Sequence, residues 1–202
     1  MSAEQLQVTF GSAILEIDAN KDGNVDATIT LEGDFKDSLF IVNQRENNTE
    51  ISYDILNTRI NRFRNQDITG GYIFAGEEES QSIRDNYRNF VEEGFAFKVA
   101  VEEGDNLMRV NRFRNQDVQG AYLYAGEEES QSIRENYRNF IEEGIAFYAA
   151  APGSSTGESI YRFQSLVNPG SYIFVGGEER QSIIDNYSSA FVEEGLAFEL
   201  LA

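Results

Sequence analysis

The stretch NRFRNQDITGGYIFAGEEESQSIRDNYRNFVEEGFAF, residues Asn61 to Phe97, decides the fold because the chain contains it three times. Residues 111–147 repeat it without a gap, with 29 of 37 positions identical. Residues 161–198 repeat it again with more substitutions and one inserted residue. Self-similarity at a fixed period of 50 residues indicates supersecondary units that pack on one another.

The first part of each copy has the pattern of two strands joined by a turn. In the first copy, residues 62–64 predict one strand and the turn runs through Asp67 to Gly70. Residues 72–75 predict the second strand, because aromatic and β-branched side chains suit a pleated, half-buried surface.

The second part predicts a helix followed by a strand. Residues 77–79 are glutamates, which suit the first turn of a helix because its unpaired amides carry a partial positive charge. The spacing of Ile83, Tyr87 and Phe90 places them on one helix face, and this predicts that Tyr87 lies in the core together with its counterparts Tyr137 and Tyr187. Residues 95–100 predict the last strand, so the unit is ββαβ.

The arrangement of the three copies follows from their size. A unit of this length cannot cover its own apolar face, so the copies must pack on one another. The absence of distinct polar end repeats favours closure around a pseudo-threefold axis, as in a β-trefoil or a three-bladed toroid. We therefore expect a mainly β fold with short helices (α+β), in a domain over residues 58–202 whose repeats span 59–104, 109–153 and 158–202.

Residues 1–57 have a different pattern, which predicts a small antiparallel β segment. Five short aliphatic or alternating runs are divided by Asn, Asp and Gly. The runs are residues 6–10, 13–17, 27–33, 39–43 and 50–55. The boundary with the repeats should lie near residues 56–58.

The composition limits the partners and the chemistry. Aromatic residues make up 12% of the chain, which is typical of a folded protein. The net charge of −19 makes nucleic acid and bare anionic membranes poor partners and cations good ones. The chain has no His and no Cys, which excludes imidazole and thiolate nucleophiles and the usual zinc ligands.

The segment DANKDGNVD, residues 18–26, predicts a calcium loop. Oxygen side chains at loop positions one, three, five and nine can converge on a hard cation, and Gly23 permits the sharp turn that this needs. The predicted ligands are Asp18, Asn20, Asp22 and Asp26, with the backbone carbonyl of Asn24. Position twelve is Ile29 rather than Glu, which indicates modest affinity. The alternative is a polar β-turn, because the same residue types favour turns.

A resemblance accompanies this loop. Residues 14–35, ILEIDANKDGNVDATITLEGDF, resemble the acidic strand-loop-strand near the C-termini of bacterial haemolysin-type (RTX) calcium-binding secreted proteins. The resemblance implies export and a calcium-rich extracellular location.

The repeats resemble an uncharacterised bacterial repeat family, often extracellular, with the pattern Y-R-[FL]-x-N, G-x-H-[FL]-Y-T, a short acidic helix and E-G-x-A-[FY]. The matching segments are YRF at 161–163, GGYIFAG at 70–76 and EEGFAF at 92–97, with their counterparts in the other copies. The His position of the family holds Tyr in all three copies, and its Thr position holds Ala75, Ala125 and Val175. Members occur beside wall-hydrolase and peptidase domains, which implies accessory binding more than catalysis.

Catalysis by carboxylates is the enzymatic alternative. Pairs of glutamates recur at 92–93, 142–143 and 193–194. Neighbours on a strand point to opposite faces, and a threefold repeated carboxylate lacks the unequal environments that separate an acid from a base. We therefore expect a protein that is not an enzyme.

Binding gives the repetition a purpose, because three equal shallow sites multiply a weak affinity for a repetitive ligand. The candidate ligand-binding residues are Tyr72, Tyr122, Tyr172, Arg62, Arg112, Arg162, Asn86, Asn136 and Asn186. Two alternatives stay open: the tyrosines of the Tyr72 set belong to the core, and the arginines pair with repeated glutamates that lock one unit to the next. The EEES clusters are typical of a solvated helix start, with weak calcium sites as the alternative.

Together these patterns predict a secreted, calcium-stabilised binding module that recognises an extracellular glycan or another cell-surface polymer. The alternative is a structural repeat of a surface layer or extracellular matrix that has no small-ligand pocket.

Overall fold

The structure is a computed structural model that describes residues 2–9, 12–18, 24–25, 27–32, 39–44, 49–54, 58–104, 107–154 and 157–200. The chain divides into two compact units, Met1–Asn57 and Thr58–Ala202. The division lies where the sequence pattern changes, and each unit is described by itself.

The described residues of the first unit form five antiparallel strands in two sheets. A three-stranded sheet has the order β1-β2-β3 and a two-stranded sheet pairs β4 with β5. The strands are β1 (Ser2–Thr9), β2 (Ser12–Asp18), β3 (Ala27–Glu32), β4 (Leu39–Gln44) and β5 (Thr49–Asp54). Each strand covers most of one run that the sequence predicted, so the antiparallel β character of this unit is confirmed.

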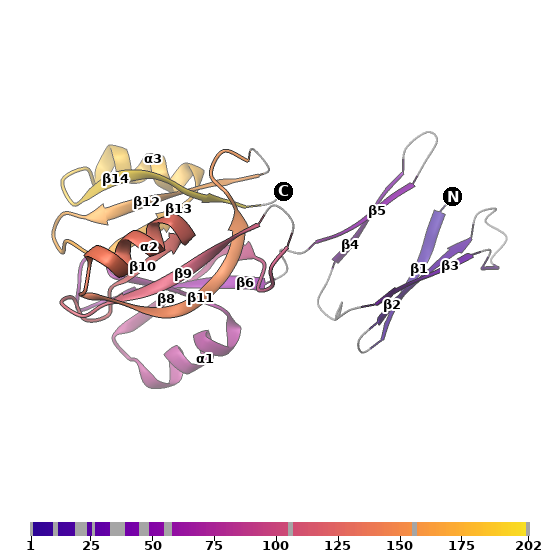
Figure 1. The fold of residues 1–202 in the computed structure, drawn as a ribbon, viewed down its shortest axis with the longest axis horizontal. Helices are drawn as coiled ribbons and strands as arrows, with labels where there is room; N and C mark the ends of the chain where they lie inside the picture. Colours follow the sequence, from indigo (N-terminus) through magenta and orange to yellow (C-terminus); the bar gives the residue numbers. More distant parts are fainter. Residues whose placement is uncertain are drawn as a thin grey trace. The chain divides into compact units, whose positions relative to one another are not determined.

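The second unit consists of three ββαβ repeats, as the sequence predicted (Figure 1). The first repeat contains β6 (Thr58–Asn65), β7 (Tyr72–Ala75), α1 (Glu77–Asn86) and β8 (Phe90–Val99). The second contains β9 (Leu107–Asn115), β10 (Tyr122–Gly126), α2 (Glu127–Asn136) and β11 (Phe140–Ala150). The third contains β12 (Ser159–Ser165), β13 (Tyr172–Val175), α3 (Gly177–Asn186) and β14 (Phe191–Glu199).

In every repeat the first strand pairs with both others, and all pairs are antiparallel. The first repeat forms the sheet β7-β6-β8, whereas the second and third share the six-stranded sheet β10-β9-β11-β14-β12-β13. An isolated bridge between Ala100 and Tyr148 links the two sheets. Strand pairing within the described residues does not form a closed barrel, and closure of the repeats in the manner of a β-trefoil stays a prediction.

The core is a cluster of aromatic rings to which every repeat contributes. The strand before each helix supplies one ring, and the strand after it supplies another. These rings belong to Phe74, Tyr124, Phe174, Phe97, Phe147 and Phe198, and each is at most 4% exposed. Their centroids lie 5.4–6.2 Å apart in edge-to-face and stacked pairs, the geometries that aromatic quadrupoles favour. The repeats therefore pack on one another through a shared core.

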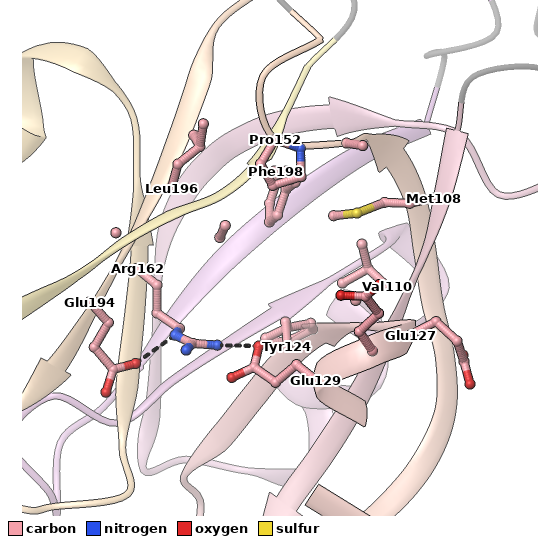
Figure 2. Close-up of a pocket in the computed structure, with 15 residues that line it drawn as sticks. Met108, Val110, Tyr124, Glu127, Glu129, Pro152, Arg162, Glu194, Leu196 and Phe198 are labelled. Atoms are coloured by element: carbon pink, nitrogen blue, oxygen red, sulfur yellow. Dashed lines mark hydrogen bonds and ion pairs between the residues drawn. The ribbon is translucent and has the colours of Figure 1, made fainter. Parts of the chain in front are cut away.

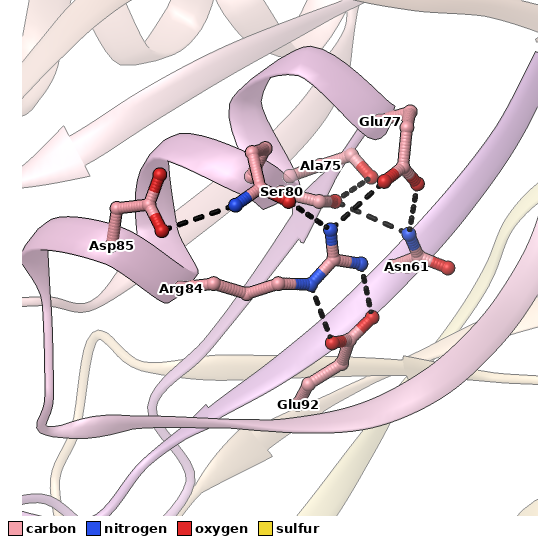
Figure 3. Close-up of polar contacts among 8 residues, drawn as sticks. Asn61, Ala75, Glu77, Ser80, Arg84, Asp85 and Glu92 are labelled. Carbon is pink, nitrogen blue, oxygen red and sulfur yellow. Dashed lines mark hydrogen bonds and ion pairs between the residues drawn. The ribbon is translucent and has the colours of Figure 1, made fainter.

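Polar contacts fasten each helix to its own strands, as Figure 3 shows for α1. Ser80 is fully buried, accepts a hydrogen bond from the Asn61 amide at 3.2 Å and donates one to the Ala75 carbonyl at 3.2 Å. Arg84 pairs with Glu77 at 2.8 Å and with Glu92 on β8 at 2.7 Å. The same contacts recur around α2. A ten-residue helix with little apolar surface is thus held mainly by polar contacts and by buried Ile83.

The prediction that Tyr87, Tyr137 and Tyr187 lie in the core is wrong, because each is 54% exposed. The helix ends at Asn86, whose side-chain amide donates to the Ser82 carbonyl at 2.9 Å. Tyr87 follows with φ −126° and ψ 81°, so it does not continue the helical face that buries Ile83. Phe90, the third member of the predicted face, begins β8.

Candidate functional site

The three arginines that the sequence singled out lie at joints between repeats. Arg62 on β6 pairs with Glu93 of its own repeat at 2.9 Å and with Glu179 of the third repeat at 2.8 Å. The same two kinds of contact recur at the other joints. Arg112 pairs with Glu143 and with Glu79 of the first repeat, and Arg162 pairs with Glu194 and with Glu129 of the second. The structure therefore has the alternative arrangement, in which these arginines join one repeat to another.

These joints are partly buried, which changes the electrostatics of their charges. Burial by itself lowers the pKa of Arg62. The hydrogen bond that Arg62 donates to Glu179 and the charges of Glu179 and Glu93 more than offset this, so the pKa is raised. The pKa of Arg162 is raised in the same way by Glu129. Both guanidinium groups stay charged and are committed to their carboxylates.

The Tyr72 set lies beneath these arginines. The guanidinium carbon of Arg62 is 5.6 Å from the centroid of the Tyr72 ring, and the equivalent distances are 5.6 Å at Tyr122 and 5.5 Å at Tyr172. Burial, followed by the charge of Glu93, raises the pKa of Tyr72. The predicted tyrosines and arginines are thus brought together, but as cation–π pairs inside the joints.

The third predicted group, Asn86, Asn136 and Asn186, lies elsewhere. Each side-chain amide donates to the backbone carbonyl four residues earlier in its own helix, at 2.9–3.0 Å. These asparagines end the helices and do not join the Tyr72 set.

A second set of contacts between repeats lies at the turns. The Asn115 amide donates to the Gly170 carbonyl at 3.0 Å, and Asn65 and Ser165 make the corresponding contacts with Gln119 and Thr69. Gly120 has φ 79°, and a Cβ there would collide with the Asn65 side chain. Glycine suits this turn for two reasons. It adopts the positive φ without strain, and its lack of a Cβ leaves room for the side chain of the neighbouring repeat.

The glutamate pairs are all bonded to arginines. Glu92 pairs with Arg84, whereas Glu93 pairs with Arg62 and Arg64. The glutamate pair of the second repeat is bonded in the same way to three arginines, whereas that of the third is bonded to two, Arg162 and Arg180. The hydrogen bond from Arg84 lowers the pKa of Glu92. In this structure the carboxylates act as ion-pair partners that connect the strands to the helices and to one another.

The EEES clusters begin the helices, as the sequence predicted. The hydrogen bond from Arg84, followed by its charge, lowers the pKa of Glu77. Glu79 belongs to the joint with Arg112. Within the described residues, no group of three or more Asp, Glu, His or Cys side chains could hold a metal ion.

A pocket of about 470 Å³ lies between the second and third repeats (Figure 2). Its apolar side chains come from β9, β14 and the segment after β11. They include Met108, Val110, Pro152, Leu196 and Phe198. Its charged side chains are Glu127, Glu128, Glu129, Arg162 and Glu194. Sequence reasoning missed this pocket because Met108 and Pro152 lie outside the segments that repeat in the sequence.

The surface also carries one exposed tyrosine per repeat, Tyr87, Tyr137 and Tyr187. The parts of the chain that the structure describes show no hydrogen bond or ring contact for these three side chains. Sequence reasoning missed them as surface residues, although the Asn immediately before each is a known signal for a helix end.

The calcium-loop prediction falls mostly outside the described residues. Asn20, Asp22 and Asp26 are not among them, Asp18 ends β2, and Asn24 is exposed. The loop stays a prediction. Among the described residues, no helix is both long and apolar enough to cross a membrane.

Comparison with known proteins gives a family and no activity. No curated protein and no solved structure matches the chain. Residues 57–201, which cover the three repeats and their joints, match the family described as a domain of unknown function (DUF5648). The chain therefore belongs to the DUF5648 family.

Proposed function

We propose that this protein is a secreted, non-enzymatic binding module that recognises an extracellular glycan or cell-surface polymer through one shallow site per repeat. The observation that carries the proposal is the exposed tyrosine at the same place in every repeat, 54% exposed in all three. These tyrosines take the place of the Tyr72 set, whose rings are covered by arginines in the joints.

The chemistry of the exposed tyrosines suits a sugar. A tyrosine ring has a flat apolar face for the C–H side of a sugar ring and a hydroxyl for hydrogen bonding. Asn86 fixes the end of α1 through its bond to Ser82, which also fixes the chain direction at Tyr87. The third repeat keeps Asp185-Asn186-Tyr187 while it replaces the following Arg-Asn by Ser188-Ser189. Core packing gives no reason to keep an exposed ring.

The number of sites suits a repetitive ligand. Three equivalent sites on one chain convert weak single contacts into a higher overall affinity when the polymer spans them. We propose further that the repeats close around a pseudo-threefold axis, which would space the three sites evenly. Both sets of joint contacts support closure, because they connect the first repeat to the second, the second to the third and the third to the first. The charge of −19 favours neutral polymers over nucleic acid and anionic membranes.

Replacing Tyr87, Tyr137 and Tyr187 together by serine is expected to abolish binding to a glycan array without changing the thermal unfolding midpoint. The rings are exposed, so their loss removes the stacking surface and leaves the core intact. Single replacements are expected to weaken binding by roughly tenfold each, since avidity falls with each lost site.

The matched control replaces Val91, Ile141 and Val192 by serine, since they are also repeated and 38–43% exposed. This control should bind as the unaltered protein does. If the tyrosine variant keeps its glycan binding, the site assignment is wrong. If the folded, unaltered protein binds no glycan, the proposal of glycan recognition fails and the structural alternative takes its place.

Calcium is proposed to stabilise the first unit through Asp18, Asn20, Asp22, Asn24 and Asp26. We expect Asp22→Asn to weaken calcium binding by at least roughly tenfold in a calorimetric titration, because one of the few charged ligands is lost. Asp67→Asn makes the same charge change at an exposed position of the repeat domain and should leave calcium affinity unchanged. Equal affinities for the Asp22 variant and the unaltered protein would favour the plain β-turn.

The second candidate function is a structural repeat of a surface layer or matrix. The observation that favours it is the commitment of Arg62, Arg112 and Arg162 to joints between repeats, where they strengthen the domain. The glycan array separates the two candidates, because a structural repeat needs no small-ligand site.

A further inference from the structure

We propose that the pocket between the second and third repeats binds a small organic cation that carries an apolar body. This site is separate from the exposed tyrosines and does not depend on glycan recognition. The pocket volume of about 470 Å³ lies in the range that proteins use for small molecules, roughly 300–1,000 Å³.

The walls of the pocket indicate that the ligand has an apolar body. Met108 and Val110 on β9 lie opposite Leu196 and Phe198 on β14, with Pro152 closing one end (Figure 2). Val110 and Phe198 are each 1% exposed and are fixed in the core, whereas the thioether of Met108 can adapt to a guest. A ligand without an apolar part would leave this surface wet, so a purely polar ion is a poor occupant.

The positive charge follows from the rim. Four glutamates and one arginine line the pocket. Arg162 is already paired with Glu129 at 2.8 Å and with Glu194 at 2.7 Å, and Glu127 is paired with Arg134 at 3.0 Å. Within the described residues the side-chain carboxylate of Glu128 has no hydrogen bond or ion pair. The rim therefore keeps a net negative charge that attracts a cation and repels an anion.

The spacing of the carboxylates selects an organic cation over a metal ion. Glu127, Glu128 and Glu129 begin α2, whereas Glu194 lies on β14 of the other repeat. Figure 2 shows Glu194 and Glu127 on opposite sides of the pocket. The described residues contain no metal-holding cluster, which agrees with carboxylates that do not converge on one point. A bulky ammonium group between the walls fits this arrangement better than a dehydrated metal ion.

The corresponding place in the third repeat is built differently. There the Glu158 carboxylate lies against Gly176, so that an added Cβ on Gly176 would collide with it. In the second repeat Met108 lies against Gly126, and its sulfur is 3.5 Å from the position of an added Cβ. Met108 therefore adds an apolar side chain at a position where the third repeat has a carboxylate.

The test compares three probes with the same apolar body and different charge: phenethylamine, 2-phenylethanol and 3-phenylpropanoate. Each is titrated into the full chain and binding is followed by protein NMR. Phenethylamine is expected to bind roughly tenfold more tightly than the alcohol, because only the amine gains from the negative rim. The propanoate should be the weakest. Equal binding of all three, tightest binding by the propanoate, or no binding of the amine at millimolar concentration would overturn the proposal.

A matched pair of variants locates the site. Glu128→Gln removes the carboxylate that has no partner among the described residues and is expected to weaken phenethylamine binding roughly threefold. Glu78→Gln makes the same change at the equivalent position of α1, in the first repeat, and should have no effect. Both residues are exposed, so both variants should fold. Equal effects of the two changes, or none from Glu128→Gln, would show that the amine does not occupy this pocket.

Discussion

Truncation of Phe147 to alanine is expected to lower the free energy of unfolding by about 3–5 kcal/mol. Phe147 is 2% exposed, and its ring lies 5.8 Å from Phe97, 5.9 Å from Tyr124 and 5.4 Å from Phe198. These partners come from all three repeats, so the truncation leaves a cavity where the repeats meet. Urea denaturation followed by circular dichroism and by tyrosine fluorescence measures the effect.

Ile145→Ala is the matched control for this experiment. Ile145 lies on the same strand two residues earlier and is 49% exposed. Its truncation should cost no more than about 0.5 kcal/mol. Equal losses from the two changes would mean that the aromatic cluster is not the main source of stability.

Replacement of Arg112 by alanine is expected to lower the free energy of unfolding by about 2 kcal/mol. The change leaves the Glu79 carboxylate without its arginine, leaves Glu143 with Arg114 alone, and uncovers the Tyr122 ring. Loss of one partner from a fully buried ion pair costs roughly 3–5 kcal/mol, and the side-chain exposures of 40% for Glu79 and 26% for Glu143 reduce that value through solvent screening. Chemical denaturation provides the measurement.

Arg114→Ala is the control that distinguishes the loss of the contact between repeats from the loss of one positive charge. Arg114 also pairs with Glu143, at 3.0 Å, but it is 44% exposed and makes no ion pair with another repeat among the described residues. Its loss should cost less than about 1 kcal/mol. If Arg112→Ala lowers the free energy of unfolding as little as Arg114→Ala does, the joint does not stabilise the domain.

The elements of a repeat were predictable because their signals are local. The run Tyr72–Ala75 is a strand in the structure with the bounds that its aromatic and β-branched residues predicted. The helix begins at Glu77, where acidic residues suit its first turn. Such local signals act within a few residues, and the three copies repeat them, so the ββαβ order could be found from sequence.

Tyr87 shows how a local interaction overrides a periodic pattern. Its spacing from Ile83 fits a helical face, but the side chain of Asn86 ends the helix one residue earlier. The error followed from extending a spacing of four beyond the last helical turn. Asn before Tyr was the signal that could have corrected it.

The partners of the arginines could not be predicted from one repeat. Arg62 finds its glutamate 117 residues away, in the third repeat. The copies are so similar that the sequence does not distinguish Glu79, Glu129 and Glu179 as partners of a given arginine. Only the packing of the repeats decides which one lies within reach. The pocket beside Met108 was hidden for a related reason, because its walls come from two repeats.

If the repeats close as proposed, the joints also limit how many repeats one domain can hold. Each repeat presents an arginine on one side and a helix-start glutamate on the other, so the contact is heterologous, with unlike halves. The third repeat supplies Glu179 to Arg62 of the first, so each of these three arginines is paired with a helix-start glutamate of another repeat. A fourth copy would have to break that contact before it could enter. In the closed arrangement that we propose, the joint itself therefore sets the number of repeats at three.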